Sequence, residues 1–153
     1  YRALDERLGV PVAVKILTLV SADAHARLRQ EASIQASLRH PNVVAVTDTI
    51  DIDGWPGLVM ELVEGPSLER MLDDGALPRD EALDLFAGVL EGVAAAHGRG
   101  LIHRDLKPSN VLVTEQGGKR LPKIIDFGVA KATAQNLTEK TIVTELGALI
   151  GTP

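Results

Sequence analysis

The chain has 153 residues, 45% of them hydrophobic, and carries a formal net charge of −5. This length suits a single domain with a sizeable core, whereas the acidic balance argues against general binding to nucleic acid or anionic membranes. Cysteine is absent, which excludes disulfides and cysteine-based zinc sites. No apolar run approaches the roughly 18 residues of a membrane span and no signal peptide opens the chain, so we expect a cytoplasmic segment.

The N-terminal part is expected to contain two strands and one helix. Residues 1–17 form the strands around a turn at residues 5–9, and the second strand is apolar except for Lys15. A lysine in such a strand most simply snorkels to water at a sheet edge. Residues 21–38 have a thin apolar stripe, which predicts a helix lying on a small sheet. Its Glu31, taken alone, is most simply a solvated residue.

The later elements follow from apolar periodicity and turn residues. They are strands at 43–52 and 57–60 joined by a turn at Asp53-Gly54, a short helix at 67–72, a long helix at 78–97, and a strand pair at 111–113 and 123–125 around Gly117-Gly118. The long helix has apolar residues at spacings of three and four, and Pro78 suits its first turn. We interpret this helix as part of the core.

Two loops near the last strand pair carry the clearest chemistry: His-Arg-Asp-Leu-Lys-Pro-Ser-Asn at 103–110 and Asp-Phe-Gly at 126–128. Asp105 can accept a proton from an alcohol, and Lys107 can neutralise a transferring phosphoryl group. Asn110 and Asp126 offer hard oxygens to Mg²⁺. These residue types on loops at strand ends suit phosphoryl transfer from a metal-bound nucleotide.

The order H-R-D-L-x-x-x-N followed by D-F-G is the protein-kinase signature. Other elements stand at matching places: V-A-V-K at 12–15, the helix glutamate, H-P-N at 40–42, Met-Glu at 60–61 and G-T-P at 151–153. With them the chain resembles a eukaryotic-like bacterial serine/threonine protein kinase over residues 1–153. Lys107-Pro108 after the aspartate favours Ser/Thr over Tyr specificity. Small-molecule kinases of related fold, a distant alternative, usually lack Arg104 and the D-F-G phenylalanine.

The resemblance implies an α+β, bilobal protein-kinase-like fold that is truncated at both ends. Residues 1–60 would form a small β-rich N-lobe that has one helix, αC, and lacks the glycine-rich loop. Residues 61–66 would be the hinge, and residues 67–153 a partial helical C-lobe ending within the activation segment. We expect apolar faces such as that of the 78–97 helix to be exposed, and the 153 residues alone to have little or no activity.

The resemblance also implies that ATP and Mg²⁺ are used, with Asn110 and Asp126 as metal ligands. Lys15 would hold the α- and β-phosphates and pair with Glu31, because it would otherwise be unpaired in the cleft. Asp105 would act as the catalytic base, with Lys107 near the γ-phosphate and Asn110 beside them. His103 is better interpreted as orienting this loop than as a base.

The adenine would lie between Ala13 and Leu112, with Met60 at the back of its pocket. Its hydrogen bonds would go to backbone, the Glu61 carbonyl and the Val63 amide. These assignments follow from position in the family pattern.

Three residues are implied in regulation: Arg104, Phe127 and Thr144. Residues 131–153 are similar to an activation segment, in which we expect phosphorylated Thr144 to pair with Arg104; unmodified loop threonines remain the alternative. Phe127 would pack inward and report active or inactive geometry. Gln35 replaces the apolar residue usual in the stack that joins the helix to Phe127, so the active helix position should be less stable.

We therefore expect a protein kinase domain that phosphorylates Ser or Thr hydroxyls of protein substrates. No nucleic-acid partner and no membrane contact by this segment are expected, although relatives of this type can be membrane-anchored or carry repeat domains. Two alternatives stay open: a nucleotide-binding pseudokinase that scaffolds partners, and an inactive truncated product. The presence of Lys15, Asp105, Asn110 and Asp126 disfavours the pseudokinase.

Overall fold

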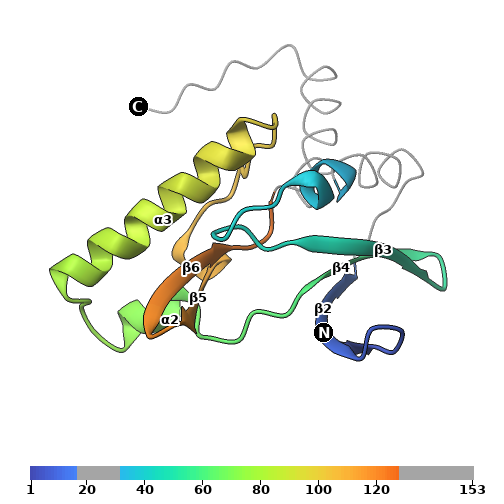
Figure 1. Cartoon of the computed structure of the whole chain (residues 1–153), viewed down its shortest axis with the longest axis horizontal. Coiled ribbons are helices and arrows are strands. Elements are labelled where there is room, and N and C mark those ends of the chain that lie inside the picture. The colour runs from blue at the N-terminus through green and yellow to red at the C-terminus, as the bar shows by residue number, and fades with distance from the viewer. Residues whose placement is uncertain (17–31, 128–153) are drawn as a thin grey trace, which may run out of the picture.

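The computed structural model describes residues 1–16 and 32–127, and it combines a β-sheet with a part made of helices and a hairpin (Figure 1). The sheet has four antiparallel strands in the order β1-β2-β4-β3: β1 (Arg2–Asp5), β2 (Val10–Ile16), β3 (Val46–Ile52) and β4 (Trp55–Glu61). The other part contains α2 (Leu68–Asp73), α3 (Arg79–His97), the 3-10 turn η1 (Pro108–Asn110) and the hairpin of β5 (Val111–Gln116) and β6 (Lys119–Ile124). This mixture confirms the expected α+β class.

Tight turns fix the register of the hairpins where the sequence predicts them. Between β3 and β4, Asp53 and Gly54 have φ angles of 52° and 83°, and the Asp51 carboxylate accepts the Gly54 N–H at 2.8 Å. Between β5 and β6, Gly117 and Gly118 have φ angles of 61° and 75°. Two successive residues with positive φ make the turn whose twist matches paired strands.

A bulge in β3 divides its side chains between the two faces of the sheet. The register with β4 shifts between Val46 and Asp48. Val46 therefore packs with Leu58 and Ala32 on one face, which we call the inner face, whereas Ile50 lines a cavity on the opposite, outer face. Re-aiming a side chain in this way is a common effect of bulges.

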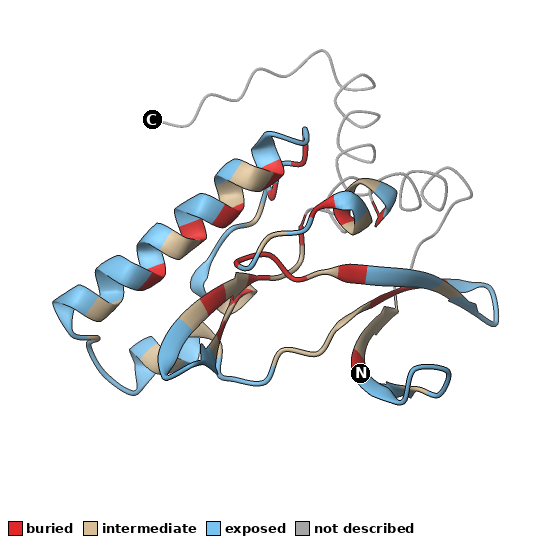
Figure 2. Ribbon diagram, viewed as in Figure 1, coloured by how far each residue is buried: buried red, intermediate tan, exposed pale blue. Residues whose placement is uncertain are grey.

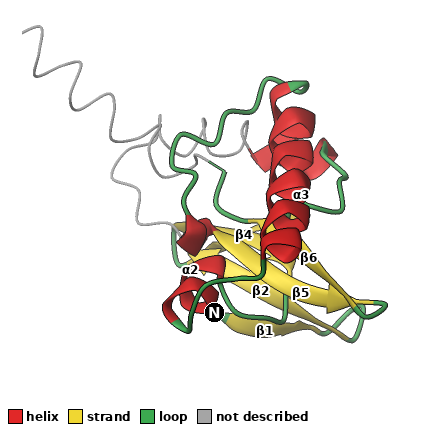
Figure 3. Ribbon diagram, turned by 90° about the vertical axis from the view of Figure 1, so that its left-hand side faces the viewer, coloured by secondary structure: helices red, strands yellow, loops and turns green. Residues whose placement is uncertain are grey.

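Helix α3 lies close against the β5–β6 hairpin (Figure 3) because glycines face it. A Cβ atom on Gly88 would lie 2.8 Å from Pro122 Cγ, and one on Gly92 would lie 2.9 Å from Ile124 Cδ1. Asn42 sits in the same contact, where its side-chain amide donates to the Pro122 carbonyl at 2.9 Å. The segment around Asn42 is thus attached to the helical part although it precedes β3.

For α3 the structure confirms the core interpretation on one face and the expected exposure of an apolar face on the other. The buried residues are Leu85, Val89, Gly92 and Ala96. The apolar residues Leu83, Phe86 and Leu90 are instead 54%, 60% and 52% exposed, as the outward face of α3 in Figure 2 shows. Periodicity alone could not separate the two faces, since both are apolar.

No helix among the described residues is long and apolar enough to cross a membrane.

Candidate active site

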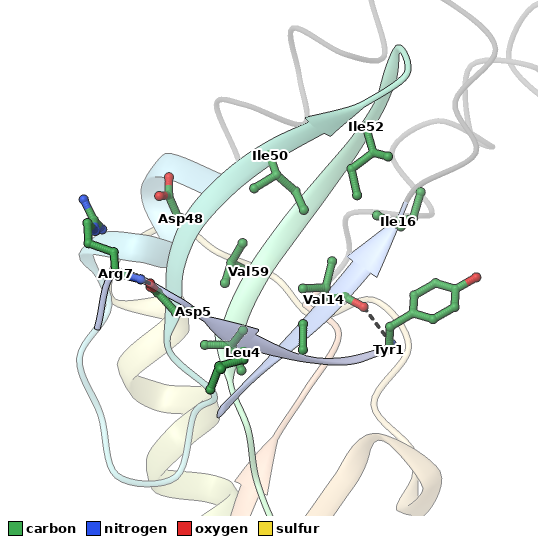
Figure 4. A pocket seen from close by; sticks show the side chains of 12 residues that line it. Tyr1, Leu4, Asp5, Arg7, Val14, Ile16, Asp48, Ile50, Ile52 and Val59 are labelled. Carbon is green, nitrogen blue, oxygen red and sulfur yellow. Dashed lines mark hydrogen bonds between the residues drawn. The ribbon is translucent and has the colours of Figure 1, made fainter. Parts of the chain in front are cut away.

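One cavity lies away from the place where the candidate residues meet. It has a volume of about 660 Å³ and lies on the outer face of the sheet, where Val12, Val14 and Ile16 project into it (Figure 4). Side chains alternate along a strand, so Ala13 and Lys15 project to the inner face. The candidate site therefore lies on the inner face, toward the helical part.

On the inner face, the strand register brings predicted nucleotide-binding residues together. Ala13 on β2 is the partner of Met60 on β4, and Lys15 is the partner of Leu58. Directly opposite residues in an antiparallel pair share a face and touch. Met60 also packs against the buried cluster of Ala32, Val46 and Leu58. Ala13, Lys15 and Met60 thus form one continuous strip.

Lys15 pairs with Asp126, so the premise that it would be unpaired without Glu31 does not hold. Its Nζ lies 2.7 Å from Oδ1 of Asp126, and the two side chains are 30% and 35% exposed. The expected partner, Glu31, lies outside the described residues. Asp126 directly follows the short stretch after β6 and has a φ of 62°, a left-handed conformation that is costly for a residue other than glycine. With the backbone in this conformation, the Asp126 carboxylate points toward Lys15 on β2.

The 103–110 loop is held by a buried histidine. His103 is 3% exposed and accepts the Asp105 backbone N–H at Nδ1, at 3.3 Å. Nδ1 therefore carries no proton, and the protonated Nε2 donates to the Ile125 carbonyl at 2.8 Å. The ring also lies 4.8 Å from that of Phe127, which is 1% exposed. His103 thus joins the loop to the segment that carries Asp126, in agreement with an orienting role.

Asp105, Lys107 and Asn110 converge within this loop. The Asn110 side-chain amide donates to the Asp105 backbone carbonyl at 2.8 Å, and the Ile125 N–H donates to the Asn110 carbonyl at 3.0 Å. Lys107 Nζ lies 3.4 Å from Asp105 Oδ2. Arg104 is exposed and has a φ of 64°. The loop therefore presents a carboxylate, an ammonium and an amide oxygen beside Asp126.

The oxygens of Asn110 and Asp126 fit a magnesium ion whose remaining ligands are phosphate and water oxygens. Because Nδ2 of Asn110 is engaged with Asp105, the amide oxygen of Asn110 is left for a ligand role. Asp126 supplies carboxylate oxygens. Among the described residues, no group of three or more His, Cys, Asp or Glu could hold a metal. Mg²⁺ typically takes one or two protein oxygens and completes its octahedron with phosphates and water.

The expected adenine-binding residues border the crossing from β4 to α2. Leu112 on β5 is partly buried and its neighbour across the hairpin is Lys123. Gly65, in the crossing segment, has a φ of 152° and touches β5 so closely that a Cβ atom would lie 2.0 Å from the Val113 carbonyl oxygen. Val63, in the same crossing segment, is partly buried.

Sequence reasoning missed a charged contact at this crossing. The Glu61 carboxylate accepts hydrogen bonds from Lys123 Nζ at 2.8 and 2.9 Å and from the Ala45 N–H at 2.8 Å. The family pattern implies only that the Glu61 carbonyl contacts the adenine, and it gives the Glu61 side chain no role. The available signal was one acidic and one basic residue, each beside an otherwise apolar strand.

Some predicted residues cannot be placed in the site. Glu31 and Thr144, most of the 21–38 helix and all of the expected activation segment lie outside the described residues, whereas residues 32–37 are helical. Gln35 is 2% exposed, so this polar side chain does occupy an interior position.

Comparisons with known proteins agree with this geometry. A family model described as "protein kinase domain" matches residues 1–147. A probable serine/threonine-protein kinase of Bifidobacterium longum, pknA2, is 39% identical over 159 residues, which cover 99% of this chain and 20% of that protein. The crystal structure of the Mycobacterium tuberculosis PknI kinase domain superposes with a TM-score of 0.74 at 29% identity, covering 85% of this chain and 54% of that chain.

A solved structure of Rad53 in complex with AMP-PNP has the same TM-score, 0.74, and the same identity, 29%, and covers 84% of this chain and 34% of that one. The chain spans only about a fifth of the length of the first curated relatives it matches, between 19% and 23%.

Proposed function

Because the chain belongs to the protein kinase family, we propose that it transfers the γ-phosphoryl group of ATP to Ser or Thr hydroxyls of protein substrates. The observation that carries the proposal is the meeting of β2 with the two loops, in which Lys15 contacts Asp126 at 2.7 Å. His103 ties the loop of Asp105 to the segment of Asp126. Several relatives are named serine/threonine-protein kinases.

Asp105 is the proposed base. His103 and Asn110 hold its backbone, and in the proposed reaction its carboxylate orients the substrate hydroxyl and accepts its proton. Lys107, 3.4 Å from that carboxylate, then lies where it can offset negative charge on the phosphoryl group. Most of the rate in such reactions comes from positioning and charge neutralisation.

Asn110 and Asp126 are the proposed ligands of Mg²⁺, which when bound neutralises phosphate charge. Lys15 is the proposed partner of the α- and β-phosphates. In the present structure Lys15 and Asp126 satisfy each other. Both are about a third exposed, so solvent screening keeps the pair weak and lets either residue turn to a ligand.

Ala13 and Leu112 are the proposed walls of the adenine site, with Met60 behind it and the backbone of Glu61 and Val63 at its edge. The proposed regulatory residues are Arg104, Phe127 and Thr144. Glu31 is the proposed partner of Lys15. Use of ATP favours a cytoplasmic location for this segment.

The experiment is phosphoryl transfer from labelled ATP by the full-length protein to a generic Ser/Thr substrate, compared with Asp105→Asn and Asp126→Asn variants. Transfer that needs a divalent cation and is lost in both variants is expected. Transfer that persists in both would refute the assignment. Tight ATP binding with no transfer under any metal would favour the scaffold alternative.

A further inference from the structure

We propose that Glu61 and Lys123 form a strut that positions the adenine-binding backbone at residues 61–63 over Leu112, so that both side chains are positioning residues for nucleotide binding. The inference rests on the proposed function in one respect, because it takes the backbone of residues 61–63 as the adenine site. It adds roles for the Glu61 carboxylate and for Lys123.

The first support is the number of segments that meet at the Glu61 carboxylate. Oε1 accepts the Ala45 N–H at 2.8 Å, and both oxygens accept Lys123 Nζ, at 2.8 and 2.9 Å. The Glu61 N–H in turn donates to the Ala45 carbonyl at 3.0 Å. One side chain thus joins the end of β4, the residue that precedes β3 and the C-terminal end of β6.

The second support is burial. The Lys123 side chain is 15% exposed and that of Glu61 33%, whereas the members of the Lys107–Asp105 pair are 53% and 40% exposed. Charge-assisted hydrogen bonds that are shielded from solvent are stronger than exposed ones. Removing one partner also leaves the other charge uncompensated in a partly buried place.

The third support is where the crossing segment is anchored. Glu61 fixes its beginning to β6, and the Pro66 carbonyl fixes its end by accepting the Val113 N–H of β5 at 2.9 Å. Between these anchors the segment borders a cavity of about 380 Å³ shared with the hairpin. Side-chain packing does not fill this space, so the anchors determine how far the segment stands from the hairpin.

The last support is the position of Lys123 itself. It is the direct cross-strand partner of Leu112, and opposite residues in an antiparallel pair share a face. The residue that holds the edge of the proposed adenine site therefore stands beside the residue that forms its floor. Breaking the ion pair should let the edge move relative to the floor.

The test measures binding of adenosine and of Mg²⁺-tripolyphosphate separately in the full-length protein by calorimetry. Lys123→Met, which keeps the aliphatic stem, should weaken adenosine binding about tenfold and leave tripolyphosphate binding unchanged. In turnover it should raise KM for ATP with kcat nearly constant, as expected when uniform binding is lost. Lys123→Arg should restore most of the adenosine affinity.

The matched control is Arg120→Met, which breaks another ion pair of β6, to Glu81 on α3, away from the crossing. Glu61→Gln, which retains the Ala45 hydrogen bond, serves as a second variant and should show an intermediate loss. Adenosine affinity in Lys123→Met and Glu61→Gln equal to that of Arg120→Met would overturn the strut, even if phosphoryl transfer is intact.

The strut and the proposed function can fail separately. Strut-dependent adenosine binding without phosphoryl transfer would support the strut and refute the kinase activity. Absence of any adenosine binding by the unmodified protein would overturn both.

Discussion

The ammonium group of Lys15 and the carboxylate of Asp126 form an ion pair of 2.7 Å that joins the sheet to the loop after β6. The two residues are far apart in sequence, one on β2 and the other beyond β6. The same two residues are the proposed contacts of the nucleotide phosphates and of the metal. In the proposed reaction, ligand binding must therefore replace this pair.

Replacing Lys15 with Met should lower phosphoryl transfer by roughly 10²–10³-fold, the usual loss when a preorganised electrostatic contact to the reacting phosphates is removed. The control is Lys119→Met, because Lys119 is an exposed residue at the start of β6. Steady-state kinetics with a peptide substrate makes the comparison. An equal effect of both variants would show that net charge, and not this contact, is responsible.

Asp105→Asn should lower transfer by about 10²–10⁴-fold, since a positioned general base contributes that much. The Asn110 and His103 contacts of Asp105 are made by its backbone, so the substitution should keep them while it removes the charge that faces Lys107. Single-turnover kinetics and calorimetric ATP binding separate the two effects. A parallel loss of ATP affinity would assign Asp105 to nucleotide binding.

Gly65→Ala should destabilise the fold more than Gly75→Ala. Both glycines have large positive φ, 152° and 145°, which costs about 1–3 kcal/mol for alanine. Only at Gly65 would the new Cβ meet another atom, the Val113 carbonyl oxygen at 2.0 Å. Forcing that backbone contact apart adds about 1–3 kcal/mol. Urea unfolding of the two variants measures the difference, and equal free energies of unfolding would exclude the clash.

Local signals predicted the hairpins and α3 because their causes are local. Asp53-Gly54 and Gly117-Gly118 adopt the positive φ angles that such turns need. The bulge at Val46, by contrast, depends on which face of β3 meets the helix at residues 32–37, and no residue pattern within β3 shows it. The family pattern predicts an exposed apolar face on α3, but apolar periodicity does not say that Phe86 lies on that face.

For the candidate site, the motif order identified the residues that the loops bring together. Their partners were less predictable. The family pattern pairs Lys15 with Glu31, but among the described residues Lys15 pairs with Asp126, a contact between β2 and the loop after β6, which most of the chain separates. The Glu61–Lys123 contact is of the same kind. Ion pairs between distant segments depend on tertiary packing, which the spacing within one motif does not report.

The last prediction concerns Arg104, which is exposed and makes no ion pair with any residue in the described ranges. Arg104 directly precedes the proposed base in the chain, and its φ of 64° is a strained backbone conformation for a residue other than glycine. A phosphate adds about −1.5 to −2 charge, and we expect Thr144, which lies outside the described residues, to carry it. If the two groups meet, Thr144→Ala and Arg104→Ala should each reduce activity, by about 5–150-fold for a typical coupling.

If Arg104 pairs with phosphorylated Thr144, the activity losses of the two alanine variants should not be additive. This non-additivity distinguishes the pairing from two independent effects. If Arg104 acts only by receiving the phosphate, the double variant should be no less active than either single variant. Thr138→Ala is the control, because it removes another threonine from the same segment. Phosphopeptide mass spectrometry of the active protein locates the modification. An unmodified Thr144, or losses that multiply in the double variant, would mean that Arg104 supports Asp105 without any phosphate.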